Sequence, residues 1–218
     1  MPRPAFKRLE IAQRAAILEK AGTMFADKGY DGTSYNRLIQ EIGFSKGAMY
    51  HYFEDKDDLF QTTVNEVSSE FIATIAPQKE LATFGDYWHE VGQICTRFLD
   101  FLNVEKKRNN LLWWIVRLPE GRESHQALKQ GHDAIFGLLT SVVERGQEVG
   151  AVQTDMHPRV IAQVIFGVVD GLWKGYSVER DETSSRPRVG TMLELIRRVG
   201  APRALIFSQD VPSLAGPS

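Results

Sequence analysis

Apolar residues recur at steps of three and four along almost the whole chain, and this spacing is the feature that most constrains the fold. In residues 10–28 the spaced residues are Ile11, Ala15, Leu18, Ala21, Met24 and Phe25. This period is typical of helices with one buried face, whereas strands would show apolar residues at every second position. We find no convincing strand pattern and no internal repeat in the sequence, so we predict an all-α protein.

Capping and turn residues divide this pattern into about nine helices. Gly29, Gly43 and Gly150 follow the ends of three of them, and Ser45 and Asp55 precede the starts of two others. Asp58, three residues after Asp55, suggests a capping box with Asp in place of Glu. The predicted helices cover about residues 10–28, 34–42, 45–53, 56–75, 84–101, 111–116, 128–149, 158–173 and 189–199. Residues 179–188 are predicted to form a polar loop.

The bulk properties describe an ordinary globular chain. The 218 residues carry a net charge of −2, which does not by itself mark a nucleic-acid binder, although residues 1–20 hold five basic and two acidic residues. No apolar run is long enough to span a membrane, and the N-terminus lacks the apolar core of a secretory signal. A single cysteine excludes an intrachain disulfide. We therefore expect a cytoplasmic protein.

The stretch GFSKGAMYHYF, residues 43–53, has two distinct faces when it is drawn as a helix. Met49 and Phe53 share one face, with Ala48 and Tyr52 at its borders. The opposite face carries Lys46, Gly47, Tyr50 and His51. A helix that enters a DNA groove needs small residues at the contact and donors at its flanks, and a preceding helix with a Gly turn completes a helix-turn-helix. The residues alone are equally compatible with a surface helix whose small residues pack against another helix.

The segment TSYNRLIQEIGFSKGAMYHYFEDKDDL, residues 33–59, resembles the DNA-binding signature of the TetR family of transcriptional regulators. The stretch RAAILEKAGTMFADKGYDGTS before it is similar to the family's first helix, and residues 142–172 resemble a later pair of its helices. The sequence departs from the family pattern at residues 40–42, where small residues such as Ala are more common. The resemblance implies an N-terminal three-helix helix-turn-helix domain, residues 1–55, and a C-terminal helical domain for ligand binding and dimerisation, residues 56–202. Residues 203–218 are expected to form a loose tail.

The same resemblance assigns roles to residues of the first domain. Positions that hold the phosphate backbone in the family are occupied here by Thr33, Ser34, Tyr50, Tyr52 and Lys56. Positions that meet base edges are occupied by Lys46, Gly47, Ala48 and His51, and the preceding helix adds Tyr35 and Arg37. Each residue also has a plainer reading: Tyr52 as half-buried core, or Lys56 as a solvated lysine of a first helical turn.

The second domain contains all four tryptophans. A helical domain with this aromatic content commonly holds an apolar ligand between its helices, although each aromatic taken singly is usually core. We predict a small apolar or aromatic effector that is oriented by one or two polar groups. The residues predicted to line its site are Trp88, His89, Phe98, Asn110, Trp113, Trp114, Phe166 and Trp173.

Three glycines spaced four apart in the helix predicted over 158–173 and just beyond it suggest close contact with another helix. Each Gly inside a helix costs ~1 kcal/mol relative to Ala, so a helix that keeps three of them has another use for the space. In the family the last two helices form the interface of a two-fold dimer. The predicted interface residues are Val164, Gly167, Val168, Gly171, Gly175, Met192 and Ile196.

No motif of an enzyme, a metal site or a cofactor site is apparent: the histidines lack zinc spacing, and there is no glycine-rich phosphate loop. The sequence therefore indicates a homodimeric transcription factor, a repressor that a small molecule releases from a roughly palindromic DNA operator. Two alternatives stay open from the residues: a helical ligand-binding protein that lacks DNA affinity, and a helical enzyme with an unrecognised site.

Overall fold

The computed structural model describes residues 2–104, 109–117, 126–178 and 185–202 of the chain. Side chains are further described except for residues 103, 104, 109, 110, 173–178 and 185–188. Within this part every regular element is a helix, as predicted, and none of the helices combines the length and apolar character that crossing a membrane requires. The predicted tail, residues 203–218, lies outside it.

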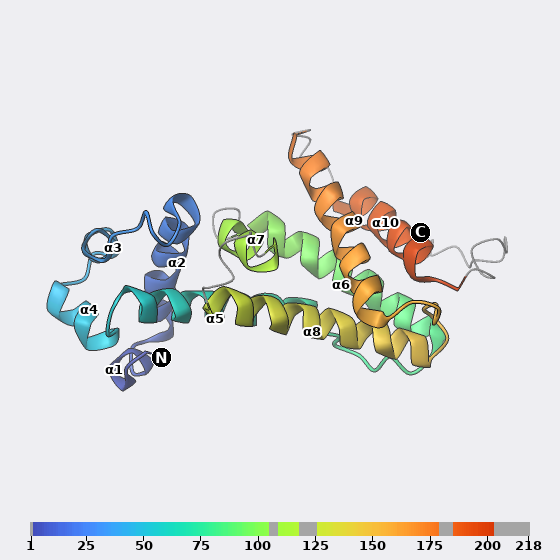
Figure 1. The fold of residues 1–218 in the computed structure, drawn as a ribbon, viewed down its shortest axis with the longest axis horizontal. Coiled ribbons are helices and arrows are strands. Elements are labelled where there is room, and N and C mark those ends of the chain that lie inside the picture. The colour runs from blue at the N-terminus through green and yellow to red at the C-terminus, as the bar shows by residue number, and fades with distance from the viewer. Residues whose placement is uncertain (1, 105–108, 118–125, 179–184, 203–218) are drawn as a thin grey trace. The chain divides into compact units, whose positions relative to one another are not determined.

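Ten helices occupy the described residues, one more than predicted (Figure 1). They are α1 (Pro4–Lys7), α2 (Ile11–Lys28), α3 (Tyr35–Ile42), α4 (Lys46–Tyr52), α5 (Lys56–Ile75), α6 (Phe84–Val104), α7 (Asn109–Arg117), α8 (Gln126–Glu148), α9 (Pro158–Val178) and α10 (Ser185–Gly200). The additional helix is α1, whose first residue is Pro4. Proline favours this position because the first helical N–H has no intrahelical partner.

The helix α10 begins inside the segment that was predicted as a polar loop. Its first residues are Ser185 to Arg188, and Pro187 lies in the first turn. Proline is tolerated there because the missing N–H would make no helical hydrogen bond. The loop prediction was therefore wrong for residues 185–188, while residues 179–184 lie outside the described part.

The chain divides into two compact units. The first contains residues 1–74 and 101–135, and the second contains residues 75–100 and 136–218. The unit boundaries fall within α5, α6 and α8.

Aromatic side chains form the core of the first unit between α2 and α5. Phe25 on α2 and Phe60 on α5 are buried, with ring centroids 4.8 Å apart in an edge-to-face arrangement. The helix α3 packs against α2, and α4 follows α3 across a short turn (Figure 1). The sequence "LLWWIV" of α7 is buried as predicted: five of its six residues are buried, and Trp114 is half-buried.

The predicted buried face of α2 was wrong over its first two turns. Ile11 is 77% exposed and Ala15 is also exposed, whereas Ile17 is fully buried. From Leu18 onward the predicted residues Leu18, Ala21 and Phe25 are buried as expected. The start of the helix therefore carries apolar residues that the core of the unit does not cover.

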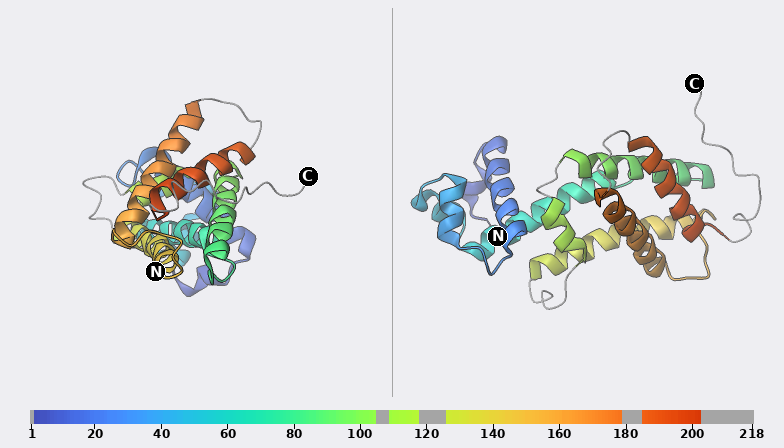
Figure 2. Two further views of the ribbon diagram at one scale, coloured as in Figure 1. Left: turned by 90° about the vertical axis from the view of Figure 1, so that its right-hand side faces the viewer. Right: turned by 90° about the horizontal axis from the view of Figure 1, so that it is seen from above.

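The second unit has one apolar core to which α6, α8, α9 and α10 all contribute. Its largest members include Tyr87 and Trp88 of α6, Ile161 of α9, and Met192 and Ile196 of α10. The helices α9 and α10 lie side by side, and the two further views agree (Figure 2).

Candidate nucleic-acid interface

Two glycines with positive φ shape the entry to α3 and α4. Gly29 ends α2 with φ of 74°, and Gly43 ends α3 in the left-handed conformation with φ of 86°. A side chain rarely adopts this region, so Gly is the residue that allows each helix to stop at these positions. The chain turns from α3 to α4 over the three residues 43–45, which is the connection of a helix-turn-helix.

The two faces of α4 are those predicted from the sequence. Met49 and Phe53 are fully buried, and Ala48 and Tyr52 are half-buried at the borders. The remaining face is exposed and consists of Lys46, Gly47, Tyr50 and His51. One helix thus fixes itself in the core with two side chains and presents a cation, a phenol and an imidazole to the outside.

The exposed face of α4 also contains a gap. A Cβ atom built on Gly47 would meet no atom of the protein within 4 Å. Neither packing nor a positive φ therefore requires glycine at this position. A close approach of the backbone to another molecule would require it, and the edges of DNA bases in the major groove make such an approach.

Two serines precede helices, and only one of them makes a capping hydrogen bond with its side chain. Ser45 caps α4, because its Oγ accepts a hydrogen bond from the Ala48 N–H at 3.1 Å. Ser34 precedes α3 and makes no such bond, and its side chain is exposed. The hydroxyl of Ser34 and the first N–H groups of α3 therefore remain available to an anion such as a DNA phosphate.

Tyr35 and Tyr50 form a pair between α3 and α4. Their ring centroids are 5.3 Å apart with the planes at 87°, and the Tyr35 hydroxyl is buried without a hydrogen-bond partner in the described structure. Burial, followed by the charges of Tyr50, Asp55 and Asp58, raises the pKa of Tyr35 to about 12. The phenol therefore stays protonated at neutral pH and keeps a hydrogen-bond donor to offer.

The hydroxyl of Thr33 has partners inside the protein. It is buried and donates to the Gly29 carbonyl at 2.6 Å and to the Met24 carbonyl at 3.3 Å. Sequence reasoning placed this hydroxyl on a phosphate, and that contact stays a prediction. What the structure gives Thr33 is a role in holding the end of α2.

The ammonium group of Lys56 also has interaction partners within the first unit. Its Nζ donates to the Tyr30 carbonyl at 2.9 Å and lies 3.9 Å from the centre of the Tyr30 ring. An ammonium has three donors, so one bond to a carbonyl leaves others for a phosphate. A substitution of Lys56 would remove the link to Tyr30 together with any phosphate contact, so it cannot test the two roles separately.

Tyr52 is a border residue packed by other rings. The centroids of Phe44 and Phe6 lie 6.1 Å and 6.4 Å from its own. The sequence analysis did not anticipate a partner from the N-terminal segment. The sequence does contain a hint of this contact. Phe6 lies two residues after Pro4, and an apolar residue that closely follows a proline is typical of a short helix with one buried side chain.

The predicted effector residues are distributed over both units. In the second unit Trp88 is buried in the core, with Tyr87 and Arg197 as neighbours at 5.2 Å and 5.1 Å from its ring. Phe98 is half-buried against the same core, and the half-buried Phe166 stacks edge-to-face on Phe136 at 5.3 Å. Phe98 and Phe166 therefore keep part of their rings accessible, whereas Trp88 does not.

In the first unit, Trp113 is buried and Trp114 is half-buried, so the two neighbours differ in environment as their positions on a helix require. The Arg117 guanidinium lies 4.6 Å from the ring centre of Trp113. Two other predicted effector residues, Asn110 and Trp173, have side chains outside the described residues.

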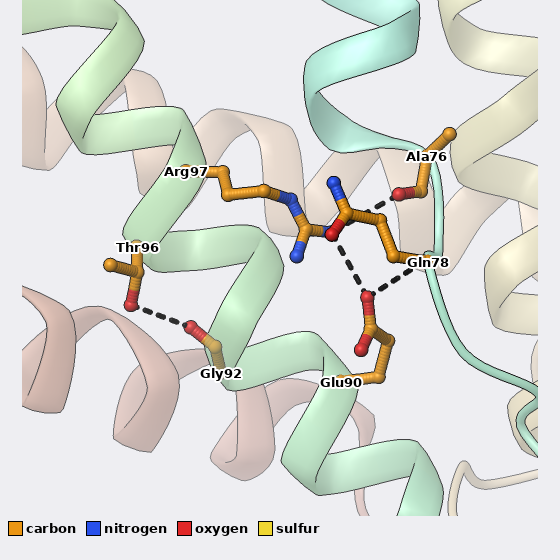
Figure 3. Close-up of polar contacts among 6 residues, drawn as sticks. All are labelled: Ala76, Gln78, Glu90, Gly92, Thr96 and Arg97. Atoms are coloured by element: carbon orange, nitrogen blue, oxygen red, sulfur yellow. Dashed lines mark hydrogen bonds and ion pairs between the residues drawn. The ribbon is translucent and has the colours of Figure 1, made fainter.

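His89 was predicted to orient an effector, but its side chain is exposed. Its neighbour Glu90 is buried instead, and sequence reasoning missed it. Glu90 Oε1 accepts from Arg97 at 3.0 Å and from the Gln78 N–H at 2.9 Å, and Arg97 also donates to the Ala76 carbonyl at 3.1 Å (Figure 3). This pair ties residues 76–78, which follow α5, to α6. The signal was an acid and a base seven residues apart, on one face of the helix.

The predicted interface residues fall into two groups. Val164, Gly167 and Gly171 are exposed on α9 and Val168 is half-exposed, while a Cβ on either glycine would meet nothing within 4 Å. Met192 and Ile196 are buried in the core of their own unit, and their place at a dimer interface stays a prediction. Their apolar side chains belong to the core that α6, α8, α9 and α10 share. Gly175 lies outside the residues whose side chains are described.

The described residues contain no group of three or more His, Cys, Asp and Glu side chains that could hold a metal ion. His132 instead places Nδ1 3.1 Å from the Val116 carbonyl and 3.2 Å from the Ile115 carbonyl, at the end of α7. Burial raises the pKa of the Cys95 thiol to about 12, so the thiolate needed for a nucleophile is not formed near neutral pH.

Comparison with known proteins agrees with this geometry. Residues 17–63, which include α3 and α4, match the profile of the bacterial regulatory proteins of the tetR family. The HTH-type transcriptional repressor AcnR of Corynebacterium jeikeium is 39% identical over 177 residues, which cover 78% of this chain and 84% of that protein. The HTH-type transcriptional repressor Rv1474c of Mycobacterium tuberculosis is 43% identical over 70 residues, which are 32% of this chain and span only 37% of that repressor.

Solved structures share the fold. The crystal structure of the transcriptional regulator FadR from Bacillus subtilis in complex with stearoyl-CoA superimposes with a TM-score of 0.64. The sequences are 19% identical, and the superposition covers 83% of this chain and 96% of that one.

Proposed function

Because the chain belongs to the TetR family of bacterial regulatory proteins, we propose that it is a transcriptional repressor that binds an operator through the exposed face of α4. The observation that carries this proposal is the combination of Lys46, Tyr50 and His51 around the open space at Gly47. A regulator of this kind works where the chromosome lies, in the cytoplasm. The family membership disfavours the alternatives of an enzyme and of a binding protein without DNA affinity.

Within this proposal the residues of α3, α4 and their flanks divide into two roles. Lys46, Gly47, Ala48 and His51 meet base edges in the major groove, where lysine donates to the acceptors of guanine. Ser34, Tyr35 and Tyr50 hold the phosphate backbone beside them, and Tyr52, Thr33 and Lys56 mainly fix the geometry of the unit. Phosphate contacts position a protein on DNA, and base contacts select the sequence.

This division predicts different effects for Lys46→Ala and Tyr50→Phe. Lys46→Ala or His51→Ala should cost ~1–3 kcal/mol at particular base pairs and relax the preference there. Tyr50→Phe should weaken binding to every sequence by the same factor, because it removes a donor to phosphate. Affinities for a panel of operators with single base-pair substitutions separate the two. A uniform loss for all three variants would show that α4 does not read bases.

We propose further that a second copy of the chain covers the stripe Val160, Val164, Gly167, Val168 and Gly171 on α9. Val160 and Val164 are 45% and 43% exposed, and the two glycines leave room for a neighbouring helix. A two-fold dimer would present two α4 helices, and such pairs read roughly palindromic sites with half-sites about one DNA turn apart.

Gly171→Leu is expected to split or distort this dimer without disturbing the fold of one chain, because the added side chain meets open space. Sedimentation should show monomers at concentrations where the wild type is dimeric, and operator affinity should fall with them. Gly137→Leu is the matched control, since Gly137 is an exposed helical glycine on α8 with equal room. A wild-type monomer that binds the operator tightly would contradict the proposed dimer.

The effector that we propose is a small molecule with a largely apolar or aromatic body. Support comes from the half-buried rings of Phe98 and Phe166 in the second unit and from the stearoyl-CoA bound to the B. subtilis regulator of the same fold. Release of DNA requires only that the effector bind the non-binding conformation more tightly. All four tryptophans follow residue 80, so an effector should change their fluorescence as it fills its site. An inducer that leaves this emission unchanged, or one that is small and highly charged, would contradict the proposal.

A further inference from the structure

The short helix α1 is attached to the far end of α4. The Arg3 N–H donates to the Tyr52 carbonyl at 2.9 Å, and this carbonyl lies in the last turn of α4. Phe6 is buried, with its ring centroid 4.7 Å from that of Phe53, the residue that ends α4. One backbone bond and one buried ring therefore fix the N-terminal segment to the helix that we propose reads DNA.

The charged residues of this segment are all basic. Residues 2–8 contain Arg3, Lys7 and Arg8 and no acidic residue, and all three cations are exposed. Residues 1–60 as a whole are balanced, with nine basic and nine acidic residues, so the charge is concentrated rather than general. The buried Phe6 holds the exposed cations beside the C-terminal end of α4.

The charge of Arg3 also reaches the predicted phosphate contacts. The positive charge of Arg3 lowers the pKa of the Tyr35 phenol, against the larger raising effect of burial. Tyr35 in turn contacts Tyr50, and its hydroxyl has no partner among the described residues. Arg3, which precedes α1, therefore interacts electrostatically with the Tyr35–Tyr50 pair of α3 and α4.

We propose that α1 belongs to the DNA interface, with Arg3, Lys7 and Arg8 bound to backbone phosphates beside the base pairs that α4 reads. This inference rests on the proposed function and extends its interface beyond α3 and α4. Phosphates follow one another along each strand at about 3.4 Å per base pair of helix axis. The six residues from Arg3 to Arg8, about 9 Å long at the helical rise, therefore face two to three of them. In a dimer the contacts are doubled.

The salt dependence of binding measures these contacts directly, because each neutralised phosphate contributes about 0.9 to the slope of log K against log[salt]. We expect Lys7→Ala/Arg8→Ala to lower the slope by about two to four units per dimer and to weaken all sequences equally. The control is Lys79→Ala/Lys129→Ala, which removes the same charge from two exposed lysines outside α1–α5. This control should leave the slope within about half a unit of the wild type.

A second variant tests whether docking matters. Phe6→Ala keeps every charge but removes the ring that holds α1 on α4, and we expect it to lose most of the same slope. Circular dichroism would verify that both variants are folded. If wild-type DNA binding is normal and Lys7→Ala/Arg8→Ala retains the full slope, α1 is only a structural support and the inference is wrong. A full slope in Phe6→Ala would refute the docked geometry. If the wild type binds no duplex, it is the proposed function that fails.

Discussion

Gly47→Leu should abolish operator binding and leave the protein as stable as the wild type. The added side chain meets no protein atom in the free chain, because a Cβ at this position has open space for 4 Å. A helical glycine also costs up to ~1 kcal/mol relative to residues such as Leu, so the unfolding midpoint should stay constant or rise.

Bound to DNA, the same side chain would occupy the space that the bases require. Displacing α4 from the groove removes the contacts of Lys46 and His51, each worth ~1–3 kcal/mol, so affinity should fall on the order of 100-fold or more. Gly137→Leu is again the control, because it makes the same substitution at an open helical glycine on α8. Thermal unfolding and operator titration of the two variants give the comparison. Tight binding by Gly47→Leu would show that this face of α4 does not approach DNA.

Arg97→Met should produce the largest loss of stability. The Glu90 side chain is 2% exposed and the Arg97 side chain is 21% exposed, so the substitution leaves a buried carboxylate without its cation. Breaking a buried pair in this way costs about 3–5 kcal/mol. Arg198→Met provides the control: its partner Glu194 is 55% exposed, and loss of such a surface pair should cost less than about 1 kcal/mol.

A double variant identifies the cause of the loss. Glu90→Gln/Arg97→Met has no buried charge, and the Gln side-chain oxygen can still accept from the Gln78 N–H. We expect this variant to recover most of the stability that Arg97→Met loses, as measured by urea or thermal unfolding. Equal losses for Arg97→Met and Arg198→Met would mean that water reaches Glu90 in solution.

The recognition helix could be predicted from the sequence because its pattern is local. The alternation of Met49 and Phe53 with Lys46, Tyr50 and His51 depends only on the helical period, and the structure has the same two faces. The capping of α4 by Ser45 was predictable for the same reason, since both partners lie within one turn.

The roles of Thr33 and Lys56 depend on partners that the local pattern does not reveal. The carbonyls of Gly29 and Tyr30 that accept from them lie in the turn after α2, and the fold of this turn brings them within reach of Thr33 and Lys56. Whether a polar side chain faces DNA or a carbonyl of its own chain is therefore decided by tertiary structure.

Helical phase explains why His89 was chosen in place of Glu90. His89 and Glu90 are adjacent, and a shift of one residue, about 100° on a helix, exchanges the exposed side chain for the buried one. Met192 and Ile196 were predicted at an interface because the resemblance places the last two helices there; both are buried in the core of their own unit, and apolarity alone does not distinguish a core within one chain from a surface shared between two.

Selection of bound duplexes from a random DNA pool tests the central claim most directly, since it requires no knowledge of the operator. Wild-type protein should enrich one motif with two related half-sites about one helical turn apart or at a related spacing, and Gly47→Leu protein should enrich none. A wild-type pool that stays as random as the input after repeated rounds at low salt would contradict the account, whatever small molecule the protein proves to bind.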